Sequence, residues 1–297
     1  SRSRVTIWSV AYTGELTPKQ KVVVMGASTG KLASERFFRS WSCKDAAKGV
    51  VLISHGLGEH SGRYNHVAQA FTANHLHVYA LDHIGHGESP GKRAFVESFN
   101  ELTTGVAELR SYIASEHPDL PVVLIGHSMG GLIAARTVLD ASTDYQTLIL
   151  TGPLLGVPTP PPAWQTWLLR TLNALFPAAK ALEIDASAVS RDQTVVDDYA
   201  ADPLVHHKNI PARTVVSLFD EASAVLGRAS EISLPTLLLH GEEDVLTSVP
   251  ASRQFMADLS ATDKHILVYP GMYHELFNEP EKEDIIRTCL DWIATRL

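Results

Sequence analysis

The chain has 297 residues, which is enough for one large domain with an inserted subdomain, although length alone would also allow two small domains. Its hydrophobic content of 45% and charged content of 20% are typical of a folded globular protein and exclude a disordered, collagen-like or membrane-spanning chain. The formal charge of −8, without any cluster of Lys and Arg residues, predicts no nucleic-acid partner.

Cysteine usage and the N-terminal segment bear on the compartment. Cys43 and Cys289 are the only cysteines and lie far apart, so the sequence indicates neither a disulfide framework nor a zinc ligand set. The first residues lack the apolar core of a signal peptide, and no stretch approaches the ~20 apolar residues that span a bilayer. We therefore expect a cytoplasmic protein whose contact with membranes is peripheral.

Six short apolar runs rich in β-branched residues alternate with helical patterns along the chain. This alternation predicts an α/β fold with a mostly parallel central sheet flanked by helices, because strands buried on both faces are continuously apolar. Ligand sites in such sheets lie at the carboxyl ends of the strands, so functional residues are expected directly after each run. The predicted strands span residues 50–53, 77–81, 122–125, 147–150, 236–239 and 266–269.

The alternation of predicted strands and helices stops between residues 150 and 234. A proline-rich stretch, 158–162, opens a segment with helical periodicity and no convincing strand. We interpret it as an inserted helical cap, so that the domains are core 1–153, cap 154–232 and core 233–297. Apolar residues at helical spacing predict an amphipathic helix, whose apolar face either packs on a core of its own, the commoner case, or lines an acyl channel or touches lipid. Its members are Trp164, Trp167, Leu168, Thr171, Leu172, Leu175 and Phe176.

The motif G-x-S-x-G occurs at residues 126–130, between the strand that ends at Ile125 and a helical pattern at 132–139. A strand-to-helix turn this tight requires small flanking residues and leaves the serine hydroxyl exposed above the sheet. The motif alone is common by chance, but the strand before it and the helix after it favour Ser128 as a nucleophile.

A serine hydroxyl is a poor nucleophile near neutral pH and needs a base that is itself held by an acid. His274 follows the last predicted strand, and Asp244 follows the strand before it. We predict His274 as the general base and Asp244 as its acid, with Glu242 and Glu243 as rival acids. The order Ser, Asp, His along the chain is typical of hydrolases built on this kind of sheet.

A tetrahedral intermediate also requires fixed donors for its oxyanion. We expect these to be the backbone N–H of Met129, directly after the nucleophile, and that of Leu57, in the glycine-rich loop 55–60 after the first predicted strand.

Two other interpretations of the motifs are weaker. The glycines of the loop, Gly56, Gly58 and Gly62, do not have the G-x-G-x-x-G spacing of a dinucleotide site. His75-x-His77 and His83-x-x-His86 lack a third ligand at a convincing spacing, so we interpret these histidines as structural. The sequence predicts no metal and no cofactor.

With these residues identified, the chain closely resembles the monoacylglycerol lipases (monoglyceride lipases) of the serine α/β-hydrolases from about residue 30 to its end. The resemblance implies the α/β-hydrolase fold, a mobile lid that seeks membranes, and a long apolar tunnel for the acyl chain, to which we assign Leu154, Leu155, Trp164, Trp167 and Leu168. It rests on the segments 55–64, 82–89 and 126–131, on the loops of Asp244 and His274, and on the cap segments 184–187, 190–191, 199 and 202–204.

The resemblance also implies polar groups around the glycerol head, at positions that match Glu59, Arg63 and Tyr199 here; without it, these would be surface polar residues and a packing tyrosine. The chain departs from mammalian members after His274, where Glu275-Leu276-Phe277 stands in place of a pattern with a further polar histidine. Recognition of the head group is expected to differ accordingly.

We therefore expect a serine hydrolase that cleaves monoacylglycerol to a fatty acid and glycerol through an acyl-enzyme. A lysophospholipase, a broad carboxylesterase, and a lipid-binding protein of the same fold without catalysis are the alternatives, and a proline-type peptidase fits less well. Transient contact of the cap with a membrane surface is part of the same expectation.

Overall fold

The computed structural model describes residues 27–297, so the segment that precedes the family resemblance lies outside the described residues. An eight-stranded sheet in the order β1-β2-β4-β3-β5-β6-β9-β10 forms its centre. Strand β2 pairs antiparallel with β1 and β4, and all other neighbours are parallel. The strands are β1 (Ser28–Lys31), β2 (Phe37–Trp41), β3 (Gly49–Ser54), β4 (Leu76–Leu81), β5 (Val122–His127), β6 (Thr147–Thr151), β9 (Thr236–Gly241) and β10 (Lys264–Tyr269).

All six predicted strands are present in the sheet, as β3, β4, β5, β6, β9 and β10. The two antiparallel strands β1 and β2 were not expected from the sequence. Strand β1 is short, polar and largely exposed, and β2 is interrupted by Arg39, which is buried against Asp82 and Glu88. Neither strand therefore has the continuous apolar run that marks a buried parallel strand.

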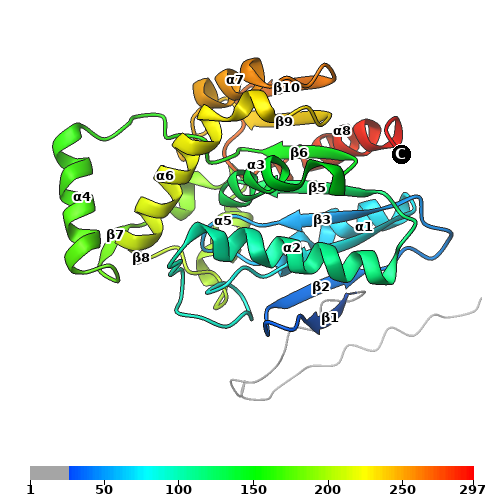
Figure 1. Ribbon diagram of the computed structural model, residues 1–297, viewed down its shortest axis with the longest axis horizontal. Helices are drawn as coiled ribbons and strands as arrows, with labels where there is room; N and C mark the ends of the chain where they lie inside the picture. The colour runs from blue at the N-terminus through cyan, green and yellow to red at the C-terminus, as the bar shows by residue number, and fades with distance from the viewer. Residues whose placement is uncertain (1–26) are drawn as a thin grey trace, which may run out of the picture.

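Helices cover both faces of the sheet (Figure 1). Alternate residues of β3 face opposite sides, so that Val50 and Leu52 pack with α2 (Phe99–Glu116) and α3 (Met129–Ala141), while Val51 and Ile53 pack with α1 (Asn65–Ala73) and α8 (Lys282–Ala294). Two apolar cores, one on each face, thus hold the strand ends in fixed positions. Helix α7 (Val249–Asp258) adds Phe255 and Met256 to the first core.

The segment between β6 and β9 is mostly helical, as predicted. It also holds a two-stranded antiparallel sheet of β7 and β8, which are too short to give an alternating pattern in the sequence. Helix α6 returns to the body of the protein, where Leu218, Ala222 and Val225 join the first core, whereas α4 stands away from the sheet (Figure 1). The elements are α4 (Ala163–Leu175), β7 (Lys180–Leu182), α5 (Gln193–Ala201), β8 (Ile210–Pro211) and α6 (Ala212–Gly227).

Short 3-10 helices complete the chain: Ser61–Tyr64, Ser142–Asp144, Ala186–Ala188, Ala229–Glu231 and Leu276–Asn278. Within residues 27–297, no helix combines the length and the apolar character needed to cross a membrane.

Candidate active site

Ser128 occupies the turn between β5 and α3, at the carboxyl end of the central strand. Its backbone has φ 54° and ψ −120°, a left-handed conformation that is uncommon for a residue with a side chain. A Cβ at Gly126 would overlap the Gly130 carbonyl, and a Cβ at Gly130 would overlap the Ser54 carbonyl on β3. The two motif glycines are therefore required by close backbone contacts that hold Ser128 in this turn.

His274 and Asp244 meet in the loops that follow β10 and β9. The Nδ1–H of His274 donates to Oδ2 of Asp244 at 2.7 Å, which leaves Nε2 as the free ring nitrogen, and both side chains are buried. Ser128 and His274 line the same cavity. The rival acids Glu242 and Glu243 are exposed, so Asp244 is the carboxylate of this loop that lies beside the imidazole.

Both carboxylate oxygens of Asp244 accept hydrogen bonds. Its Oδ1 accepts the backbone N–H groups of Leu246 and Thr247 at 2.8 and 3.0 Å. Its Oδ2 accepts, besides His274, the Thr247 hydroxyl at 2.8 Å and the Nε2–H of His240 at 3.1 Å. Burial by itself would raise the pKa of Asp244, but the neighbouring His274 and the hydrogen bonds from His240 and His274 outweigh it and hold this pKa well below its usual range.

The contact with Asp244 also shifts the pKa of His274, the predicted base. Burial lowers the pKa of the His274 imidazole, but the charge of Asp244 and the hydrogen bond to it outweigh burial, so the net shift is upward from the usual 6.5. An imidazole with a raised pKa is a stronger base for a serine proton.

The loop 55–60 lies against the nucleophile. A Cβ at Gly56 would lie 3.2 Å from Cβ of Ser128. The N–H of Gly56 donates to Oε1 of Glu59 at 2.6 Å and is therefore used within the loop, whereas Leu57, the next residue, lines the cavity. Met129 is the first residue of α3, where a backbone N–H has no acceptor within the helix. Met129 thus follows Ser128 in the chain and Leu57 lines the same cavity, and their role as oxyanion donors stays a prediction.

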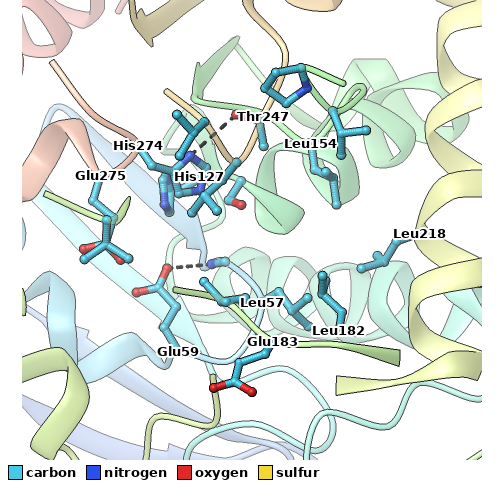
Figure 2. A pocket seen from close by; sticks show the side chains of 18 of the residues that line it. Leu57, Glu59, His127, Leu154, Leu182, Glu183, Leu218, Thr247, His274 and Glu275 are labelled. Carbon is cyan, nitrogen blue, oxygen red and sulfur yellow. Dashed lines mark hydrogen bonds between the residues drawn. The ribbon is translucent and has the colours of Figure 1, made fainter. Parts of the chain in front are cut away.

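A cavity of about 420 Å³ opens beside Ser128 and has two unlike sides. Figure 2 shows His274, His127, Glu59 and Glu275 gathered on one side, and Leu154, Leu182 and Leu218 on the other. A ligand with one polar and one apolar end would fit such a cavity in one orientation.

The three predicted head-group residues are placed differently. Glu59 and Tyr199 line the cavity. Arg63 does not; its guanidinium lies behind, where it donates to Glu59 at 2.8 Å and to both oxygens of Glu275 at 2.7 and 2.6 Å, 4.7 Å from the centre of the Tyr199 ring. A minor cavity next to the main one is lined by Arg63, together with Glu59, Tyr64, His127, Glu275, Phe277 and Asn278.

Only one of the five predicted acyl-channel residues lines the cavity: Leu154. Leu155 is buried in the first core instead. Trp164, Trp167 and Leu168 of α4 are 64%, 68% and 53% exposed, so they neither line this cavity nor pack on a core of their own. The predicted helix is present as α4, but the sequence could not identify what its apolar side chains contact.

Residues that line the apolar side were missed by the sequence reasoning. They come from the loop after β6, from β7 and the residues just after it, and from α6. These segments are separated in the sequence, and nothing in their order along the chain predicts that they meet. They include Val157, Pro158, Leu182, Ile184, Val215, Leu218 and Phe219.

Four polar residues of the site also had no role assigned from the sequence. His127, next to the nucleophile, donates Nδ1–H to the Thr151 carbonyl at 3.0 Å, and burial lowers its pKa to about 4. Thr247 and His240 bind Asp244, and Glu275 lines the cavity. Position beside a motif residue was the signal in the sequence for His127, and the departure from the mammalian pattern after His274 was the signal for Glu275; no comparable signal marked His240.

The histidines weighed as metal ligands have other partners. His83 contacts the Ser54 hydroxyl at 2.9 Å through Nε2, and His86 donates Nδ1–H to the Ile84 carbonyl at 2.9 Å. His77 accepts the backbone N–H of Cys43 at 3.3 Å. Among the described residues, no group of three or more His, Cys, Asp or Glu side chains is arranged to hold a metal ion.

Comparisons with known proteins agree with this architecture. The family model described as serine aminopeptidase S33 matches residues 45–281. A monoacylglycerol lipase of Mycolicibacterium smegmatis is 38% identical over 86% of this chain and 92% of its own length, and the human monoglyceride lipase is 33% identical over 88% and 87%. The crystal structure of a Paleococcus ferrophilus monoacylglycerol lipase, at 30% identity, superposes with a TM-score of 0.81 over 89% of this chain and 100% of that one. The chain therefore belongs to the monoacylglycerol lipase family of serine α/β-hydrolases.

Proposed function

We propose that this protein hydrolyses monoacylglycerols to a free fatty acid and glycerol, with Ser128 as nucleophile, His274 as general base and Asp244 as the acid that orients it. The observation that carries the proposal is the placement of Ser128, on a strained turn, in the same cavity as His274, whose Nδ1–H donates to Asp244 at 2.7 Å. The named relatives are lipases of this kind, which supports the choice of ester.

In the proposed reaction the Ser128 hydroxyl attacks the ester carbonyl while Nε2 of His274 takes its proton. The N–H groups of Leu57 and Met129 stabilise the oxyanion, and the imidazolium then gives the proton to the departing glycerol oxygen. Water attacks the acyl-enzyme by the same route, which releases the fatty acid and restores Ser128. Asp244 holds the imidazole tautomer throughout, and its depressed pKa keeps it ionised for that role.

The apolar and polar sides of the cavity match the two parts of a monoacylglycerol. The side lined by Leu154, Leu182 and Leu218 would take the acyl chain, and the side lined by Glu59, Glu275 and Tyr199 would take the glycerol. Ser128 and His274, which line the same cavity, would act on the ester bond where the two parts of the substrate join.

We further propose that residues 154–232 act as a cap that meets the lipid surface. Large apolar side chains on α4 and directly after it are exposed: Trp164, Trp167, Leu168, Leu175 and Phe176. Leu182 is both 40% exposed and part of the cavity wall, so the apolar surface and the cavity meet at β7. A monoacylglycerol could pass from a membrane into the cavity with little exposure to water.

Replacement of the nucleophile tests the function directly. We expect Ser128→Ala to lower kcat for 1-oleoylglycerol by about 10⁶-fold, since a residual rate from binding and the oxyanion donors alone is small. Fatty-acid release would be measured by titration, with Ser187→Ala as the matched control, because this serine is exposed in the cap and its hydroxyl donates only to Asp185 of the same short turn. Activity retained in Ser128→Ala would remove the assignment.

A further inference from the structure

The polar side of the cavity is acidic. Of the described residues that line the cavity, three are glutamates, Glu59, Glu183 and Glu275, and none is a lysine or arginine. Glu183 is exposed and pairs with Lys180, whereas Glu59 and Glu275 are buried on the side of His274 (Figure 2). A ligand group on that side therefore meets carboxylates first.

The only cation that contacts these two carboxylates in the described part of the chain is Arg63, which makes three hydrogen bonds to them. Its Nη1 donates to both Glu59 and Glu275, and its Nη2 donates to Glu275. The Tyr199 ring, which lines the cavity, packs against the guanidinium. One guanidinium thus balances one of two carboxylates and does not itself reach the cavity wall. The pair of glutamates retains a net negative charge toward the ligand.

Each carboxylate still has acceptor capacity. Oε2 of Glu59 and Oε1 of Glu275 each accept one hydrogen bond, from Arg63, although a carboxylate oxygen can accept about two. The other oxygens are occupied: Oε1 of Glu59 by Gly56 and Tyr64, and Oε2 of Glu275 by Arg63 and Asn278. The positions that remain for a ligand are hydrogen-bond acceptors. A hydroxyl group can donate to them, whereas a deprotonated phosphate oxygen cannot.

We propose that Glu275, together with Glu59, determines the alcohol of the ester: the site takes esters of polyols that carry no negative charge and rejects esters whose alcohol bears a phosphate. This inference rests on the proposed function and adds the chemical class of the leaving alcohol. Arg63 acts in it as a positioning residue that holds both carboxylates. The exclusion is electrostatic, because a phosphate group placed beside an unbalanced buried carboxylate is repelled with little screening.

The wild-type enzyme tests the charge dependence with three soluble octanoyl esters. The alcohols are glycerol, glycerol 3-phosphate and 3-(trimethylammonio)propane-1,2-diol, of which the last two are similar in bulk and opposite in charge. We expect kcat/KM for the phosphate ester to be lower than for the trimethylammonium ester by about 100-fold, as expected for like and opposite charges at a buried site. Equal values for these two esters would overturn the proposal whether or not any variant folds.

The variant Glu275→Gln assigns the effect to the residue. It keeps the shape of the side chain and removes its charge, so the ratio of kcat/KM for the phosphate ester to that for octanoylglycerol should rise by about tenfold. Glu183→Gln is the matched control, because this cavity-lining glutamate is exposed and pairs with Lys180, and it should leave this ratio unchanged. An unchanged ratio in Glu275→Gln, with a Tm that shows a folded protein, would overturn the proposal.

The same assays separate this inference from the function on which it rests. Hydrolysis of octanoylglycerol without discrimination by charge would overturn the inference alone. Hydrolysis of p-nitrophenyl octanoate without hydrolysis of octanoylglycerol would overturn the proposed function, and the inference with it.

Discussion

Asp244 accepts five hydrogen bonds, more than a carboxylate needs in order to orient one histidine. Two come from backbone N–H groups of its own loop, and these fix the carboxylate before His274 is considered. Two come from Thr247 and His240, which compete with His274 for the same oxygen, Oδ2. The strength of the base at His274 therefore depends on residues that do not touch the substrate.

Asp244→Asn removes the charge that raises the pKa of His274. We expect kcat to fall by about 10⁴-fold, as for loss of the acid in other triads, because the amide can support the wrong imidazole tautomer. The acid limb of the pH profile of kcat/KM should move to lower pH, because His274 no longer has its pKa raised and loses its proton more readily. Glu242→Gln, a change at an exposed neighbour, is the control; an Asp244→Asn enzyme with more than a tenth of the wild-type rate would contradict the role of this acid.

His240→Leu should have the opposite effect on the pH profile. His240 is fully buried, contacts the Ser252 hydroxyl at 3.0 Å through Nδ1 and donates Nε2–H to Asp244 at 3.1 Å. Without this donor the carboxylate binds the His274 imidazolium more strongly, so the acid limb should move to higher pH by roughly 0.5 to 1 unit.

The charged and titratable groups that face His274 are Asp244, Glu59, Glu275 and His127, and none of them changes in this variant. His240→Gln retains a donor and should restore the limb toward its wild-type position. Equal profiles in the leucine and glutamine variants would mean that His240 serves packing alone.

At the scale of elements, β5, the turn at Ser128 and α3 form a unit that local sequence specifies. Strand β5 is an apolar run, α3 begins at Met129, and the glycines at 126 and 130 allow the close contacts between them. Helix α4 is different. The spacing of its apolar residues predicts an apolar face, but this periodicity cannot distinguish a face that packs on protein from one that is exposed.

Trp164→Ser together with Trp167→Ser tests the exposed face of α4. Each side chain is about two-thirds exposed, and its transfer into a lipid surface would contribute on the order of 2 kcal/mol. We expect the double variant to lose at least about tenfold in partitioning to phosphatidylcholine vesicles, measured by sedimentation. Its kcat/KM on a soluble short-chain ester should stay close to wild type, because neither tryptophan lines the cavity.

Leu267→Ser is the matched control for that experiment. Leu267 is 41% exposed on β10, which Figure 1 places far from α4, so its loss should leave partitioning unchanged. Equal partitioning of the tryptophan variant and the wild type would exclude α4 as the contact.

At the scale of the whole molecule, the site depends on contacts between segments far apart in the chain. Arg63 and Glu275 are 212 residues apart, and His60 and Asp202, which join the loop 55–60 to the segment after α5, are 142 residues apart at 2.9 Å. His206 also donates its N–H to the Gly58 carbonyl at 2.6 Å. The loop 55–60 is thus held by contacts from the last third of the chain.

The sequence by itself determined the six core strands, the turn at residues 126–130 and the loops at which polar side chains occur, because each depends on the spacing of neighbouring residues. Only the tertiary structure decided which carboxylate of the loop 242–244 is buried beside His274, that Arg63 is enclosed by two glutamates, that His240 shares Asp244, and that the apolar face of α4 is exposed. These features are set by burial and charge pairing between distant segments. Local periodicity carries no information about which distant segment will lie opposite.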